Sequence, residues 1–113
     1  MGSTSTSLKE GQLVTFDPIV KDLQNFPFMT CGYEGKGAFV LYEKITIENF
    51  PLYNDFEGNK TIVKRGETGI LLSQIGIPPG ISGYQLDRPD LDFNVYTVLI
   101  NGHKVQVFGV DLV

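Results

Sequence analysis

The chain has 113 residues, 42% of them hydrophobic and 19% charged, and a formal net charge of −4. This length and composition predict one globular domain, and no apolar run approaches the roughly 20 residues that a membrane-crossing helix needs. The acidic balance disfavours general binding to nucleic acid, which attracts clustered lysine and arginine side chains.

Two features of the chain bear on its compartment. Cys31 is the single cysteine, so neither an internal disulfide nor a cysteine-based zinc site is available. The first seven residues, MGSTSTS, are small and polar, and they predict a flexible tail rather than an apolar signal peptide. We therefore expect residues 8–113 to form a single domain in the cytoplasm.

The first half of the chain predicts short strands. One lies within residues 8–17, where apolar β-formers end at a proline that cannot donate to a sheet ladder. The following segment, 18–64, is irregular in composition. It contains a compact β-rich run, AFVLY, at residues 38–42, and an alternating run at residues 45–50 that predicts a further strand.

The middle of the chain is punctuated by glycine and proline. Gly66 and Gly69 precede the apolar residues 70–72 and indicate a sharp turn into a strand. The segment GIPPGISG, residues 76–83, predicts a turn-rich linker that is not helical, because proline breaks a helix. Residues 86–93 predict an acidic loop.

The clearest local pattern is a β-hairpin near the end of the chain. Asn101-Gly102 separates two runs of β-forming residues, and this dipeptide suits the positive φ angles of a type I′ turn. Alternation along the second run places Val105 and Val107 on one face and Lys104 and Gln106 on the other. Seven or so short strands separated by turns predict an all-β barrel or sandwich.

Three segments resemble small SH3-like and KOW-type β-barrels. The opening LKEGQLV is similar to their G-x-x-V first strand, and RGETGIL at residues 65–71 resembles their turn into the second strand. The ending YTVLINGHKVQV, followed by Asp111-Leu112, resembles their distal hairpin and closing turn. This arrangement is common in small proteins of tailed bacteriophages and is similar to the SH3-like stromal subunit of photosystem I.

The resemblance implies a small SH3-like barrel with residues 18–64 as a long insertion between the first and second core strands. It carries no catalytic residue, and it implies a small structural or accessory component, located in the virion if the protein is phage-encoded. The chain has no tryptophan and lacks the acidic pattern by which signalling SH3 domains bind proline-rich peptides.

The insertion holds most of the aromatic residues of the chain, and two interpretations of them stay open. They form an extra sub-sheet with its own small core, or some of them build a docking surface, since exposed aromatic side chains mark interfaces. The candidate partner-binding residues are Phe26, Phe28, Tyr53 and Phe56.

We identify no catalytic set, metal site or cofactor in the sequence, and we expect a protein that is not an enzyme. His103 follows the hairpin turn and is expected on the surface, and Cys31 is expected to be at least half-buried. Asp87, Asp90 and Asp92 suit a solvated acidic loop better than a cation site.

Two functions follow as hypotheses. The first is a non-catalytic protein–protein interaction or assembly protein that binds a protein partner or itself, without a membrane. The alternative is a KOW-like nucleic-acid-binding module, which the acidic net charge disfavours. Its candidate residues are Lys64, Arg65, His103 and Lys104.

Overall fold

The computed structural model describes residues 8–18, 31–43, 46 and 60–113, and the structural statements below concern this part of the chain. The predicted flexible tail, all four candidate partner-binding aromatics, and, apart from Thr46, the strand predicted at residues 45–50 lie outside the described residues.

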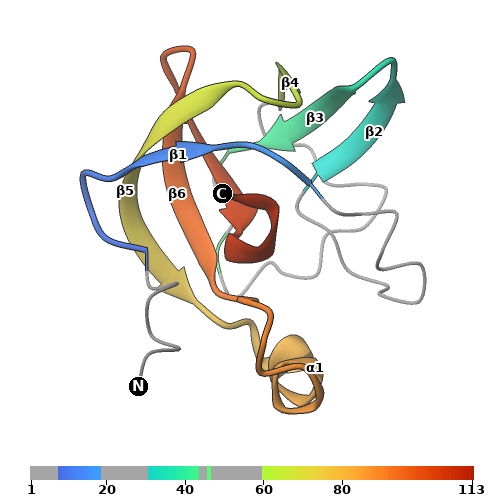
Figure 1. Ribbon diagram of the computed structural model, residues 1–113, viewed down its shortest axis with the longest axis vertical. Coiled ribbons are helices and arrows are strands. Elements are labelled where there is room, and N and C mark those ends of the chain that lie inside the picture. The colour runs from blue at the N-terminus through green and yellow to red at the C-terminus, as the bar shows by residue number, and fades with distance from the viewer. Residues whose placement is uncertain (1–7, 19–30, 44–45, 47–59) are drawn as a thin grey trace.

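The described part of the chain is all-β, as predicted, apart from one short helix (Figure 1). Seven strands form one antiparallel sheet in the order β1-β5-β6-β7-β3-β2, and β4, which lies off this path, pairs with β3. The strands are β1 (Leu13–Thr15), β2 (Cys31–Gly35), β3 (Ala38–Tyr42), β4 (Lys60–Lys64), β5 (Thr68–Gly76), β6 (Val95–Ile100) and β7 (His103–Phe108).

The residues that follow β7 return to β1. After a 3-10 turn, η4 (Gly109–Asp111), Leu112 forms an antiparallel bridge with Phe16. The backbones of Thr15 and Val113 exchange two hydrogen bonds of 3.0 and 2.8 Å. The first and last described segments of the chain are therefore neighbours.

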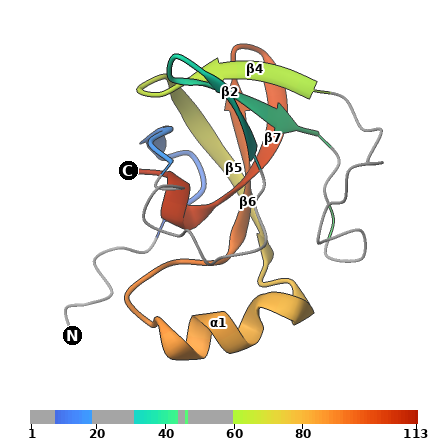
Figure 2. The ribbon, with the colours of Figure 1, turned by 90° about the vertical axis from the view of Figure 1, so that its right-hand side faces the viewer.

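The three strands between β1 and β5 extend the sheet. β2 and β3 form a hairpin, all five residues of β4 pair with β3, and the pair Tyr42–Gln106 joins β3 to β7. Figure 2 shows β4 across the top of the molecule, above the ends of the longer strands.

Within the described residues, the strands β3 and β4 contribute side chains to the main hydrophobic core. Phe39 and Val63 are fully buried in the same cluster as Val14 and Phe16. The rings of Phe16 and Phe39 meet edge to face, with centroids 5.5 Å apart. Each such side chain contributes about 1.5–3 kcal/mol by its burial, so these strands are integral to the fold.

The C-terminal hairpin forms as predicted. Asn101 and Gly102 have φ angles of +54° and +81°, and β6 and β7 pair in register from Ile100–His103 onward. Val105 and Val107 are buried on the predicted face. Gln106 is also buried, because Tyr42 of β3 lies opposite it and its side chain donates a hydrogen bond to Thr97.

The prediction of a non-helical linker at residues 76–83 is wrong. A 3-10 turn, η3 (Pro79–Ile81), leads directly into a helix, α1 (Ser82–Asp87). Pro79 occupies the first position of the turn, where the missing N–H has no intrahelical partner to lose. The helix also takes the first two residues of the predicted acidic loop.

Candidate functional site

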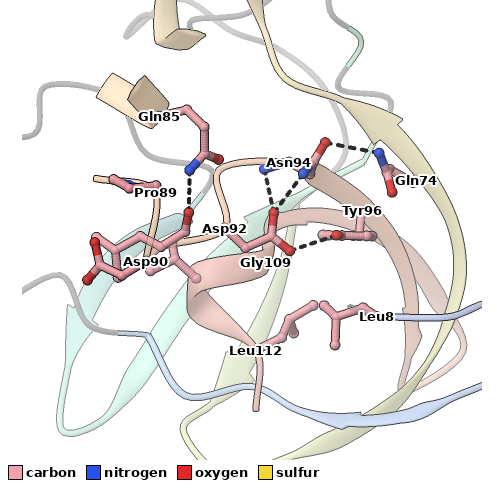
Figure 3. A pocket seen from close by; sticks show the side chains of 12 residues that line it. Leu8, Gln74, Gln85, Pro89, Asp90, Asp92, Asn94, Tyr96, Gly109 and Leu112 are labelled. Atoms are coloured by element: carbon pink, nitrogen blue, oxygen red, sulfur yellow. Dashed lines mark hydrogen bonds between the residues drawn. The ribbon is translucent and has the colours of Figure 1, made fainter. Parts of the chain in front are cut away.

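A pocket of about 510 Å³ lies between α1, the start of β6 and the C-terminal turn (Figure 3). Polar side chains from β5, α1 and the loop before β6 line it together with apolar residues near both ends of the chain. The lining residues are Leu8, Gln74, Gln85, Pro89, Asp90, Leu91, Asp92, Asn94, Tyr96, Gly109, Val110 and Leu112.

The carboxylate of Asp92 is the centre of the polar side of this pocket. Its Oδ1 accepts hydrogen bonds from the backbone N–H and the side-chain amide of Asn94, at 3.0 and 2.8 Å. Its Oδ2 accepts a bond of 2.7 Å from the Tyr96 hydroxyl, as Figure 3 shows. Both oxygens therefore bind groups of the protein itself.

The pocket amides are also bonded within the fold. Gln74 donates to the Asn94 side chain at 3.0 Å, which extends the Asp92 network to β5. Gln85 of α1 donates to the carbonyl of Leu91 and accepts from the backbone N–H of Phe93 at 2.9 Å. These bonds hold the loop before β6 against the helix and the sheet.

Close packing surrounds the Asp92–Tyr96 pair. A Cβ atom added at Gly109 would lie 2.5 Å from Asp92 Oδ2 and 2.8 Å from the Tyr96 ring, so only glycine fits there. Burial, and then the hydrogen bond to Asp92, raise the pKa of the Tyr96 phenol above its usual range. Tyr96 is therefore a neutral donor at physiological pH.

This arrangement is a hydrogen-bond network that holds the loop before β6 in place. The Asp92 oxygens accept three hydrogen bonds, all of them from Asn94 and Tyr96. Within the described residues, no three His, Cys, Asp or Glu side chains gather as metal ligands. The pocket therefore has one polar side, whose groups are bonded to one another, and an apolar rim.

The three aspartates of the predicted acidic loop have different environments. Asp87 ends α1 and is exposed, and Asp90 forms an exposed ion pair of 3.0 Å with Arg88. That guanidinium, through its hydrogen bonds, lowers the pKa of the Asp90 carboxyl. Asp92 turns inward to Tyr96, which the sequence pattern did not indicate.

Arg65, one of the predicted nucleic-acid-binding residues, is engaged in the fold. Its guanidinium donates to Asp17 at 2.6 Å and to the carbonyl of Pro18 at 2.7 Å. It also lies 5.5 Å from the centre of the Phe39 ring. Arg65 therefore ties the end of β1 to the turn between β4 and β5.

The other three candidates lie around two adjacent turns. The Asn101 side chain of the β6–β7 turn donates to Glu67 at 2.9 Å, and the backbone N–H of Lys64 donates to the same carboxylate. The Lys64 N–H is the main cause, with Asn101 second, of a lowered pKa at Glu67. Carboxylates therefore lie among the basic residues.

His103 and Lys104 begin β7, and both are exposed, as predicted for His103. His103 Nδ1 lies 3.3 Å from a carboxylate oxygen of Glu43, at the end of β3. Cys31 opens β2, and its side chain lies outside the described part of the structure.

The sequence analysis missed an apolar row on the outer face of the sheet. Leu13 of β1 pairs with Ile70 of β5, which pairs with Leu99 of β6. Leu13 is 72% exposed, Ile70 is 40% exposed, and Leu99 is half-buried. The apolar residues of β1 and β5 were visible in the sequence, but the register that aligns them on one outer face was not.

Among the described residues, no helix has the length and apolar character to cross a membrane. Comparison of the chain with protein-family models, with curated proteins and with solved structures finds no match.

Proposed function

We propose that this chain is a non-catalytic protein–protein interaction or assembly protein that uses the outer face of β1, β5 and β6. The carrying observation is the row Leu13–Ile70–Leu99, whose side chains share one face because directly paired residues of antiparallel strands do so. Three large apolar side chains side by side on an outer face are typical of an interface.

The residues that flank the row indicate the chemistry of the partner surface. Lys104 of β7 pairs with Leu99 and continues the row with a positive charge, while Thr15 and Thr68 lie opposite each other two residues along the strands, on the same face. A protein partner with an apolar strip and a carboxylate at one end complements this face.

The SH3-like character belongs to the same proposal. A barrel requires that the last strand pairs with the first, and the bridge between Phe16 and Leu112 supports this closure. The likeness to small phage barrels supports a structural or accessory component of a virion.

Site-specific photo-crosslinking tests the proposal. A photoreactive amino acid is placed at position 13, 70 or 103 of the full chain, which is expressed in the cell that naturally produces it. We expect protein adducts from positions 13 and 70 that are absent at position 103, with identification by mass spectrometry. Adducts at all three positions alike, or none at positions 13 and 70, would contradict the assigned face.

The nucleic-acid-binding alternative has one observation in its favour. The contact between Asn101 and Glu67 brings the turn that carries Lys64 and Arg65 beside the hairpin that carries Lys104. Fluorescence anisotropy with a labelled single-stranded oligonucleotide at low salt tests it. Micromolar binding that weakens as salt rises would favour this alternative, and a flat titration would remove it.

A further inference from the structure

Two exposed patches at opposite ends of the molecule complement each other in charge. One is the β4 face, defined as Lys60, Ile62 and Lys64 of β4 with Val40 and Tyr42 of β3. The other is the α1 face, defined as Leu86 and Asp87 of α1 with Asp90 in the turn that follows. Both figures place β4 at the top of the molecule and α1 at the bottom.

The β4 face is apolar in its middle and positive at its ends. Alternation along β4 buries Val63 in the core and turns Lys60, Ile62 and Lys64 outward. Ile62 is 54% exposed and pairs with Val40, and Lys60 lies 5.9 Å from the centre of the Tyr42 ring. The strand carries two positive charges and no acidic residue.

The α1 face has the opposite pattern. Leu86 is 82% exposed, which is more than any other large hydrophobic residue of the described chain. Asp87 and Asp90 are exposed beside it, Arg88 pairs with Asp90, and Asp92 turns inward to Tyr96, so the face carries one net negative charge. An exposed leucine beside carboxylates matches an exposed isoleucine between lysines.

We propose that a second copy of this chain places its α1 face on the β4 face, so that Leu86 contacts Ile62 and Val40 while aspartates face Lys60 and Lys64. This inference rests on the proposed assembly function and specifies one of its contacts. Because the two faces differ, the contact is heterologous, and repetition of it produces a closed ring or a filament.

The surface of the molecule has room for both faces. The chain exposes 6690 Å², and a standard interface covers about 800 Å² on each partner. Each face therefore needs about an eighth of the surface, and the two are too far apart to compete. The row of Leu13 and Ile70 remains available to a different protein.

Two complementary variants test the contact by light scattering behind a sizing column. The first, Lys60→Glu/Lys64→Glu, retains only the α1 face, and the second, Leu86→Ser/Asp87→Lys, retains only the β4 face. We expect the wild-type chain to form species larger than a monomer at low salt, and each variant to weaken this association by about tenfold or more. An equimolar mixture of the two variants should form a 1:1 dimer and nothing larger.

A matched control separates the local contact from total charge. Lys9→Glu/Lys36→Glu changes the net charge as much as the first variant, at exposed positions outside both faces, and should assemble like the wild type. All substituted side chains are exposed, so we expect every variant to fold, and circular dichroism checks this.

Three results would overturn the proposal: a monomeric wild type at high concentration, a wild-type assembly that both variants retain, or a mixture that stays monomeric. Oligonucleotide binding by a monomeric wild type that Lys60→Glu/Lys64→Glu abolishes would assign the β4 face to nucleic acid instead. The proposed function fails separately, through the crosslinking at positions 13 and 70.

Discussion

Replacement of Tyr96 by phenylalanine removes one hydroxyl and leaves the buried ring in place. The ring is 3% exposed, so the loss of apolar burial is negligible, and the change isolates the 2.7 Å bond to Asp92 Oδ2. A hydrogen bond to a charged acceptor contributes about 1.5–3 kcal/mol. Because Asp92 lines an open pocket that water can reach, we expect a value near the lower end, about 1.5–2 kcal/mol.

Urea unfolding followed by circular dichroism measures this loss. For a domain of this size, a loss of about 1.5–2 kcal/mol lowers the melting temperature by roughly 8 °C. The same substitution in an Asp92→Ala background should cost less than about 0.5 kcal/mol, since the acceptor is already gone. An equal cost in both backgrounds would refute the assignment of the energy to this bond.

The raised pKa of Tyr96 gives the same pair a pH dependence. Below about pH 10 the phenol is neutral in both the folded and the unfolded chain, and its contribution to stability is complete. Above that pH the unfolded chain ionises first, so the wild type loses stability by at most about 1.4 kcal/mol per pH unit from this group. The Tyr96→Phe variant lacks this loss, and the difference in unfolding free energy between the two proteins should narrow as pH rises.

Three further predictions concern packing and turn geometry. Gly69→Ala should cost about 1–3 kcal/mol in urea unfolding, because its Cβ would lie 2.6 Å from a backbone oxygen of β6, whereas Gly83→Ala in α1, with open space around it, should be neutral or stabilising. Asn101→Ala should cost about 1–2 kcal/mol by thermal unfolding, because the residue has a φ of +54° and its amide binds Glu67. Phe39→Ala should cost about 3–5 kcal/mol by denaturant unfolding, and a cost below 1 kcal/mol would show that the extra strands pack outside the main core.

The sequence predicts those elements that local chemistry decides. The strands of the C-terminal hairpin were predicted at their observed boundaries, because Asn101-Gly102 fixes both the turn and the register. The β-rich run at residues 38–42 was also found. Contacts between distant segments were not predicted, such as the pairing of Tyr42 with the buried Gln106, because alternation describes one strand and says nothing about what covers its outer face.

Helix α1 and the pocket show two other limits of prediction from the sequence. Adjacent prolines argued against a helix, yet Pro79 serves as the start of the 3-10 turn that leads into it. The pocket depends on Asp92 turning inward to Tyr96, four residues along the chain, and on Gly109 from a separate strand end leaving space for them. A sequence of three aspartates in one loop does not distinguish the inward residue from the solvated ones.

The antiparallel bridge between Phe16 and Leu112 has a consequence for the order in which the domain folds. β1 is synthesised before both of its neighbours, β5 and the residues around Leu112. Until both have been synthesised, Phe16 cannot be covered on both sides and the core stays incomplete. Pairings across such long stretches of sequence slow folding, so we expect the closure between Phe16 and Leu112 to be a late step in the folding of this domain.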